Sequence, residues 1–505
     1  MEKTVATITL IMTLLLTTAA GTVLSSSSVP EKFYLGVTYC GDSVSEAKQL
    51  VDKVKGYTNL FVLQSGELQN DTNAVNEIGD YVTNSGLSFI TYFGIDSAWL
   101  MKTWLDTYDG HWGDRFLGVY FGDEPGGKML DSEMAIYDQE TQSSLRKMAD
   151  RTIYGYKIDA NTSVTYNGDG TIVTTDVDSP EYSSIISGDP IFLQDFSFTT
   201  YFPDGRVTLT TQKVGSSEKV VENISDAPYT YEQLWDARPF QSYDETAQKF
   251  VKEISFRIDI ASRYNSQVDY EFFTSDYGLY WFDYLAGYDV VFAQFGWNQS
   301  IVQNIGLARG AANFQGKDWG AIITWKYTQE PYLDRGDEIF QQMCLAYESG
   351  ARYIVIFNYA EDMQDCYGTL KDEHFQALER FWKEEVQSST VVNGGKKGEV
   401  ALILPRSYGW GMRFPEDNIW GLWDADEKSE QIWGLCSVLI EDYGANLDIV
   451  YDDPAYPFEA KYAQIFYAFE KEIEPFPTIP IATVVSLSVA VACLGLVVYF
   501  RKRKR

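Results

Sequence analysis

The stretch Phe116-Leu-Gly-Val-Tyr-Phe-Gly-Asp-Glu-Pro125 decides how the rest of the chain is interpreted. It predicts a short apolar strand that stops at Gly122 and presents two carboxylates, Asp123 and Glu124, at its tip. Pro125 and the two glycines after it end the strand, because proline lacks the N–H that a sheet needs and glycine accepts a sharp turn. Strands disfavour aspartate, and a buried charge is costly unless it is paired or used. We therefore interpret this acid pair as the candidate centre of the protein's function.

Seven further segments share the apolar, β-rich character of this strand, and helical patterns lie between them. The eight predicted strands are 33–39, 59–66, 87–94, 116–125, 269–276, 288–296, 319–327 and 353–359. Apolar strands that are each followed by a helix indicate a parallel sheet covered by helices. Eight such units close into a barrel, so the sequence predicts a (β/α)8 TIM barrel, an α/β fold, over residues 30–390.

Two other units interrupt or follow the barrel. Residues 131–151 favour a helix, and residues 157–240 predict a β-rich insertion after strand 4, because they are rich in Thr, Ser, Val and Gly and carry hairpin-like turns. Residues 398–469 predict a small C-terminal βαβ domain, with strands at 400–404 and 447–451 around a helix near 427–442. A third strand is expected at 464–467.

Both ends of the chain resemble targeting segments. Residues 1–28 contain Lys3, then an apolar run and small residues, which predicts a signal peptide and linker, with an uncleaved anchor as the alternative. Residues 481–500 carry no charge and are long enough for about 30 Å of helix, which predicts one transmembrane helix. The basic tail 501–505 predicts a cytoplasmic C-terminus. The expected location is the cell membrane, with a single pass, an extracellular N-terminal ectodomain and a Pro-rich linker at 470–480.

Composition excludes several classes of function. The net charge of −32 argues against contact with nucleic acid, although simple solubility explains it equally well. The chain has only two histidines, His111 and His374, and neither lies at a predicted strand tip. This argues against Ser-His-Asp hydrolysis, zinc held by histidine and a histidine base. Carboxylate chemistry remains, and it needs no cofactor and no metal.

The few, widely spaced cysteines form no disulfide framework and no metal motif. Four Asn-X-Ser/Thr sequons, which begin at Asn70, Asn161, Asn223 and Asn298, are compatible with a glycoprotein outside the cell.

Barrel active sites lie at the carboxyl ends of the strands. Aromatic faces there can pack against sugar rings and amides can bind hydroxyls, although a single aromatic residue at a strand end more often caps the core. The candidate substrate-binding residues are Tyr39, Gln64, Tyr277, Gln294, Trp297, Trp325, Lys326, Tyr327, Asn358 and Tyr359. For Lys326, pairing with a carboxylate is favoured over a role as a Schiff-base amine.

The tetrapeptide Gly122-Asp-Glu-Pro125, at the end of the fourth strand of a secreted eight-unit barrel, resembles the (β/α)8 glycoside hydrolase superfamily. The flavodoxin-like unit after the barrel is similar to that of beta-galactosidase-type members. In the best-known clan of this superfamily the fourth strand ends in Asn-Glu, and the Glu is the general acid/base. The resemblance implies that role for Glu124, with Asp123 in place of the Asn.

The same clan places its nucleophilic Glu at the end of strand seven. The nearest acid in this sequence is Glu330, a few residues further along, and Asp276 and Glu361 are rivals. Taken individually, each of the three is better explained as a solvated loop acid.

The function that the sequence predicts is an extracellular, membrane-anchored glycoside hydrolase that uses paired carboxylates on an oligo- or polysaccharide. The alternative is an inactive barrel that binds glycans or serves the cell envelope. A third hypothesis is the processing of a peptide or an envelope polymer, and the scarcity of histidine argues against most versions of it.

Overall fold

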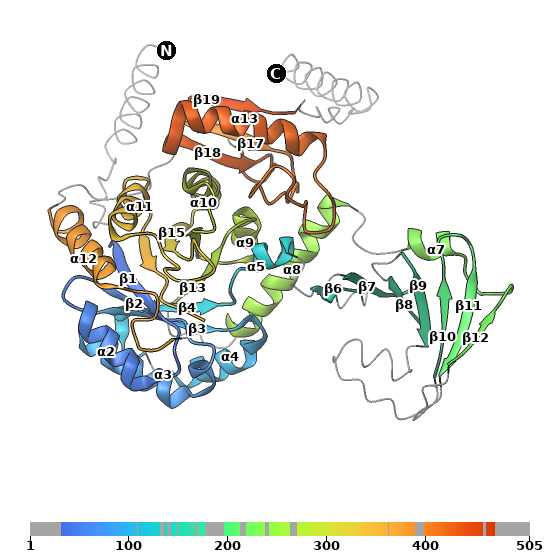
Figure 1. Cartoon of the computed structure of the whole chain (residues 1–505), viewed down its shortest axis with the longest axis horizontal. Helices are drawn as coiled ribbons and strands as arrows, with labels where there is room; N and C mark the ends of the chain where they lie inside the picture. Colours follow the sequence, from blue (N-terminus) through green and yellow to red (C-terminus); the bar gives the residue numbers. More distant parts are fainter. Residues whose placement is uncertain are drawn as a thin grey trace, which may run out of the picture.

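The computed structural model describes residues 32–108, 110–131, 136–138, 143–148, 151–159, 161–166, 170–176, 196–212, 219–237, 242–262, 270–361, 363–388, 398–457 and 461–469 (Figure 1). The expected signal peptide and linker (1–28), the Pro-rich linker (470–480) and the basic tail (501–505) lie outside these residues. The extracellular location therefore stays a prediction from sequence.

The predicted fold class was wrong in one component, the transmembrane helix. No helix in the described part of the chain has the length and apolar composition needed to cross a membrane. Helix α8 (Tyr243–Ser262) is long enough, but charged residues such as Glu245, Lys249 and Glu253 recur along it. The segment expected to cross, 481–500, lies outside the described residues.

The eight predicted barrel strands are confirmed. They are β1 (Tyr34–Tyr39), β2 (Leu60–Leu63), β3 (Ser88–Phe93), β4 (Phe116–Phe121), β13 (Glu271–Asp276), β14 (Val290–Phe295), β15 (Asp318–Ile323) and β16 (Tyr353–Ile356). Neighbouring strands pair in parallel, and β1 pairs with β16, so the sheet closes into a TIM barrel (Figure 1). All carboxyl ends therefore lie at one end of the barrel.

Helices surround the strands in Figure 1, each placed between two strands in the chain. They are α2 (Val44–Val54), α3 (Thr72–Asn84), α4 (Ala98–Thr107), α8, α9 (Tyr280–Ala286), α10 (Ile301–Gln315), α11 (Gly336–Glu348) and α12 (Asp372–Phe381). In α2 the buried residues Ala47, Leu50, Val51 and Val54 recur at the spacing of one helix face. The Ser43 side chain caps this helix by accepting a hydrogen bond from the Glu46 N–H.

The barrel strands are apolar on both faces, because one face packs against helices and the other fills the barrel. Val291 and Ala293 of β14 belong to the outer core, whereas Val290 and Phe292 belong to the inner core. By this alternation Gln294, the next inward position, lies at the carboxyl end of the barrel interior. Inner side chains at strand ends are thus directed toward the mouth of the barrel.

The β-rich insertion is larger than predicted. It is an antiparallel sheet of β5 (Ile136–Asp138), β6 (Ser143–Met148), β7 (Arg151–Lys157), β8 (Thr162–Tyr166), β9 (Ile172–Asp176), β10 (Phe196–Tyr201), β11 (Val207–Gln212) and β12 (Lys219–Asn223), with helix α7 (Tyr231–Asp236). The helix expected at 131–151 was wrong: the helical pattern there gives way to a hairpin in which β6 pairs with β7. Figure 1 shows this sheet to one side of the barrel.

The small C-terminal unit contains the three predicted strands, β17 (Val400–Leu404), β18 (Leu447–Tyr451) and β19 (Gln464–Tyr467), with helix α13 (Glu427–Tyr443). The strands pair in parallel in the order β18-β17-β19. Helix α10 packs directly on β18, since a Cβ at Gly306 would lie 2.8 Å from the Leu447 carbonyl oxygen. Beside it, Arg309 forms a fully buried ion pair of 2.7 Å with Asp448.

Candidate active site

The turn after β4 has the conformation that places both carboxylates of the acid pair at the barrel mouth. Gly122 has φ +69° and Glu124 has φ +56°, a left-handed conformation that is strained for a residue with a side chain. Pro125 then begins the short helix α5 (Pro125–Leu130). A Cβ at Gly127 would lie 2.1 Å from the Tyr277 ring, so the turn is packed closely against the end of β13.

Asp276, one of the candidates for the second catalytic acid, lies at the end of β13 and binds this turn through hydrogen bonds. Its carboxylate is fully buried and accepts backbone N–H bonds from Gly126 at 2.6 Å, Gly127 at 2.8 Å, Tyr277 at 2.7 Å and Gly278 at 3.1 Å. Burial raises the pKa of Asp276 to about 7, and the four N–H donors oppose that rise. Because both carboxylate oxygens of Asp276 already accept backbone hydrogen bonds, we interpret Asp276 as a residue that positions the β4 turn.

Glu124 is half-buried, and its surroundings keep it protonated at neutral pH. Its Oε1 accepts a hydrogen bond of 2.6 Å from Gln294 Nε2. Burial, and next the negative charge of Asp123, raise the pKa of Glu124 to about 8, against the opposing effects of Gln294 and Lys128. The backbone N–H of Glu124 donates to the Ser275 carbonyl oxygen at 3.0 Å, which fixes its position relative to β13. This is the environment of a proton donor.

Asp123 is also half-buried and belongs to a network of side-chain hydrogen bonds. Its Oδ1 accepts bonds from the Tyr120 hydroxyl and, at 3.2 Å, from the Ser275 hydroxyl. Gln294 Nε2 reaches the same Ser275 oxygen at 3.1 Å, which connects this network to Glu124. The two carboxylates are thus oriented by side chains from β4, β13 and β14.

Two amides at the mouth have an acceptor atom without a partner. Gln64 and Gln294 are nine-tenths buried or more, and the Oε1 atom of each has no hydrogen bond. The Nε2 atom of Gln64 donates to the Tyr120 hydroxyl at 3.4 Å, and the Nε2 atom of Gln294 donates to Glu124. A buried acceptor without a partner costs free energy unless a ligand or water satisfies it. Both amides therefore offer an acceptor to a donor such as a hydroxyl group.

A cluster of aromatic side chains lies at the carboxyl ends of β14, β15 and β16. The rings of Trp325 and Tyr359 are parallel, with centroids 5.9 Å apart, and Trp325 Nε1 donates to the Tyr359 carbonyl oxygen at 2.7 Å. Trp297 lies 5.9 Å from Trp325 and exposes 41% of its surface. The structure thus brings three of the predicted substrate-binding residues together, as a partly exposed aromatic surface.

Lys326 and Tyr327 lie beside this aromatic surface. The Lys326 ammonium forms an ion pair of 2.6 Å with Asp334, and this hydrogen bond raises the pKa of Lys326. A Schiff-base amine needs a lowered pKa, so the ion-pair interpretation is the one that fits, with Asp334 as a partner that the sequence did not indicate. Tyr327 is 44% exposed.

Three of the predicted binding residues form hydrogen bonds that hold loops and turns of the fold instead. The fully buried Tyr39 donates its hydroxyl to the Ser43 carbonyl oxygen at 3.0 Å. Asn358 is also fully buried and bonds the loop that follows β16, through the Cys366 carbonyl oxygen at 3.0 Å. Tyr277 donates to Asp131 at 2.6 Å.

Glu330 and Glu361, the other predicted second acids, are not drawn into the network around Glu124. The Glu330 side chain is 75% exposed and forms an ion pair of 2.7 Å with Lys371, which lowers its pKa. Glu361 is exposed. Both have the surroundings of solvated loop acids, and Asp123 is the carboxylate that shares its network with Glu124.

Tyr120 and Ser275 lie within β4 and β13 rather than at the strand tips, so the pattern of residues at the tips did not indicate them. The alternation along each strand could have indicated them. Tyr120 and Phe273 both belong to the inner core, and Ser275 is the next inward position after Phe273. Among the described residues, no group of three or more His, Cys, Asp or Glu side chains could hold a metal ion.

Comparisons with known proteins add no functional argument. No protein family and no curated protein matches the chain. Among solved structures, one similar chain is a GH5_18 variant from Streptomyces cattleya in complex with Manb1-4GlcNAc. The two chains are 9% identical, and the match covers 86% of this chain and 99% of that chain with a TM-score of 0.44. This likeness is too weak to support an argument, so the assignment of a TIM barrel rests on the strand pairing of this chain itself.

Proposed function

We propose that this protein is a glycoside hydrolase in which Glu124 is the general acid. The observation that carries the proposal is a half-buried carboxyl group at the mouth of a TIM barrel that shares a hydrogen-bond network with a second carboxylate, Asp123. Burial and the charge of Asp123 raise the pKa of Glu124 to about 8. A general acid has to hold its proton at the working pH and release it in the transition state, and enzymes achieve this by raising the pKa of a carboxyl group.

Asp123 supplies the second carboxylate. Both hydroxyl donors, Tyr120 and Ser275, reach its Oδ1 atom, and in the proposal Oδ2 faces the substrate. In the proposed reaction Glu124 gives its proton to the glycosidic oxygen as the bond from that oxygen to the anomeric carbon breaks. The Asp123 carboxylate stabilises the positive charge that develops at the anomeric carbon. Water then forms a bond to that carbon and loses a proton, which restores the protonated form of Glu124.

The remaining groups at the mouth fit a sugar. The aromatic surface of Trp297, Trp325 and Tyr359 offers flat apolar faces, which suit the C–H face of a pyranose ring. The unpartnered Oε1 atoms of Gln64 and Gln294 can accept bonds from sugar hydroxyls. A carbohydrate supplies both kinds of contact at once.

The experiment that tests the proposal is an assay of the full chain against aryl glycosides in both anomeric forms and against soluble polysaccharides. Release of aryl alcohol or of reducing ends is expected for at least one substrate. Failure of every substrate to react, with pure and folded protein, would contradict the proposal.

The pH dependence of that turnover is a prediction of its own. Because Glu124 acts in its protonated form, kcat/KM is expected to fall as the pH rises through about 8, by roughly tenfold for each further pH unit. The check is a profile from pH 5 to 10 on one aryl glycoside. Activity that keeps rising through pH 9 would exclude Glu124 as the acid.

A second candidate function is a glycan-binding barrel without turnover. The observation that favours it lies at the end of β15, where Thr324 and Trp325 follow the strand and no carboxylate stands directly at the tip. Binding of a polysaccharide without release of reducing ends, unchanged in Glu124→Gln, would favour this function over hydrolysis.

A further inference from the structure

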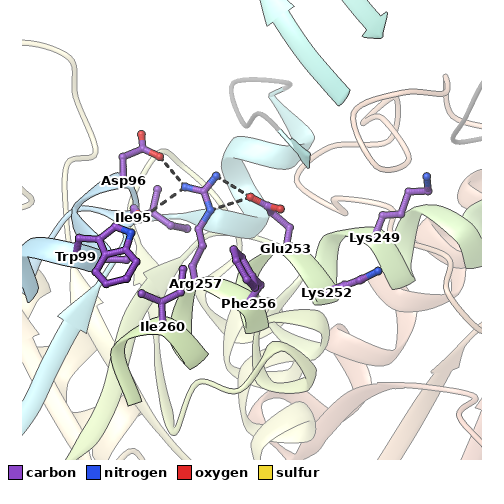
Figure 2. Close-up of a pocket in the computed structure, with 10 residues that line it drawn as sticks. Ile95, Asp96, Trp99, Lys249, Lys252, Glu253, Phe256, Arg257 and Ile260 are labelled. Carbon is purple, nitrogen blue, oxygen red and sulfur yellow. Dashed lines mark hydrogen bonds and ion pairs between the residues drawn. The ribbon is translucent and has the colours of Figure 1, made fainter. Parts of the chain in front are cut away.

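A pocket of about 330 Å³ lies on the flank of the barrel, between the segment after β3 and helix α8 (Figure 2). Ile95, Asp96 and Trp99 line it from the segment after β3 and the first turn of α4. Glu253, Phe256 and Arg257 are among the residues that line it from α8. None of these residues takes part in the network around Glu124, so the pocket is separate from the site described above.

The walls of the pocket carry exposed aromatic surface. Trp99 is 67% exposed and Phe256 is 42% exposed, and both border the same cavity (Figure 2). Large exposed aromatic residues that gather around one cavity mark binding surfaces in soluble proteins. Flat rings that keep this much accessible surface can pack against the apolar face of a sugar.

The charged residues that line the pocket are two carboxylates, Asp96 and Glu253, and three cations, Lys249, Lys252 and Arg257. Arg257 forms ion pairs with Asp96 at 2.6 Å and with the buried Glu253 at 2.7 Å, and Figure 2 shows the guanidinium group between the two carboxylates. The Asp96 side chain is 91% exposed, so it still presents acceptor atoms to a ligand. Lys249 is paired in turn with Glu245 of the same helix at 3.4 Å. Charges that are already compensated by ion pairs suit a neutral ligand that donates hydroxyl groups.

The size of the pocket favours a small ligand over a protein surface. Its volume of about 330 Å³ is at the lower end of the range for small-molecule pockets, roughly 300–1,000 Å³. A stable protein–protein interface covers about 800 Å² on each partner, far more than a compact pocket with two exposed rings offers. One or two sugar units fit this description.

The pocket adjoins the end of the barrel that carries the acid pair. A Cβ at Gly122, just before that pair, would lie 3.2 Å from the Ile95 Cβ, so the segment that lines the pocket packs on the β4 turn. The segment that lines the pocket therefore borders the turn that carries the acid pair.

We propose that this pocket is a second carbohydrate subsite, which holds a neutral sugar unit of a polysaccharide chain against Trp99 and Phe256. Hydroxyl groups of that unit donate to Asp96. The inference rests on the proposed function for the identity of the ligand as substrate, and it adds that the substrate is a neutral polymer rather than a short glycoside. The subsite contributes binding and takes no part in bond cleavage.

The test compares Trp99→Ala and Phe256→Ala with the wild type, as full chains, on two kinds of substrate. For a neutral polysaccharide (laminarin, galactomannan or hydroxyethyl cellulose, whichever is hydrolysed) KM is expected to rise about tenfold, as on removal of an aromatic anchor. For an aryl monoglycoside kcat/KM is expected to stay within about twofold, because such a substrate does not reach the pocket. Trp99→Phe keeps a ring and is expected to retain most of the affinity. Phe414→Ala, which removes an exposed ring outside the pocket, is the matched control.

Affinity electrophoresis in the same polysaccharides gives a readout that does not depend on turnover. Binding that weakens in Trp99→Ala supports the subsite even where the wild type hydrolyses nothing, and in that case the proposed hydrolysis alone fails. Three results would overturn the inference: equal losses on both kinds of substrate, no effect on the polysaccharide, or no binding of any neutral polysaccharide by the wild type.

Discussion

Glu124→Gln is expected to lower kcat on glycosides by about 10²–10⁴-fold, the usual contribution of a general acid. Glutamine has nearly the shape of the protonated carboxyl group and can keep the bond with Gln294, but it has no proton to give to the leaving oxygen. The loss should therefore depend on the leaving group. It should be largest for alkyl glycosides and polysaccharides and small for dinitrophenyl glycosides, whose leaving group departs without protonation.

The matched control is Glu361→Gln, which makes the same chemical change at an exposed acid near the end of β16. It is expected to leave kcat within about twofold, since surface substitutions away from a site rarely matter. A uniform loss for all leaving groups would show that Glu124 has another role. An equal loss in Glu361→Gln would place the acid elsewhere on the barrel mouth.

Asp276→Ala is expected to reduce the free energy of unfolding by about 3–5 kcal/mol and to abolish most of the activity. The substitution leaves the buried N–H groups of Gly126, Gly127, Tyr277 and Gly278 without an acceptor, and each unsatisfied donor costs about 1–3 kcal/mol before water enters the space. Urea unfolding followed by tryptophan fluorescence measures the stability. Activity should fall too, because the turn that holds Glu124 in its left-handed conformation loses its support.

Asp283→Asn is the control for this prediction. Asp283 is also fully buried and interacts with Asp276 without accepting the four N–H bonds, so it tests the same contact without the turn's donors. Burial, and next the charge of Asp276, raise the pKa of Asp283 well above the ordinary range, which favours its neutral form. Asparagine closely resembles a protonated aspartate, and we expect a change within about 1 kcal/mol. If Asp276→Ala were no more destabilising than this control, the four N–H bonds would not be what holds the turn.

The barrel could be predicted because each strand carries its own signal. A strand that is buried on both faces has to be apolar throughout, and the eight such runs were visible in the sequence. The hairpin of β6 and β7 was missed for the opposite reason. Residues 143–148 have no strong alternation, and they form a strand through pairing with β7 rather than through their own composition.

The candidate site was predictable only in part. The position of Glu124 followed from its place at the end of a strand, and the gathering of Trp297, Trp325 and Tyr359 followed from barrel geometry. The division of labour among the acids did not, because Asp123, Asp276 and Glu330 are chemically similar and differ only in what surrounds them. Burial under the β4 turn makes Asp276 a support, and an exposed lysine partner makes Glu330 a surface ion pair.

Helix α10 belongs to the cores of both the barrel and the small C-terminal domain. It faces the barrel on one side and β18 of the small domain on the other, and its buried residues leave little of it to solvent. Removing the small domain would expose Gly306 and Gly310 to solvent. It would also leave Arg309 on an apolar surface without its ion-pair partner Asp448. The two units therefore share one folding transition: they should melt together, with a single midpoint, and neither should be obtainable without the other.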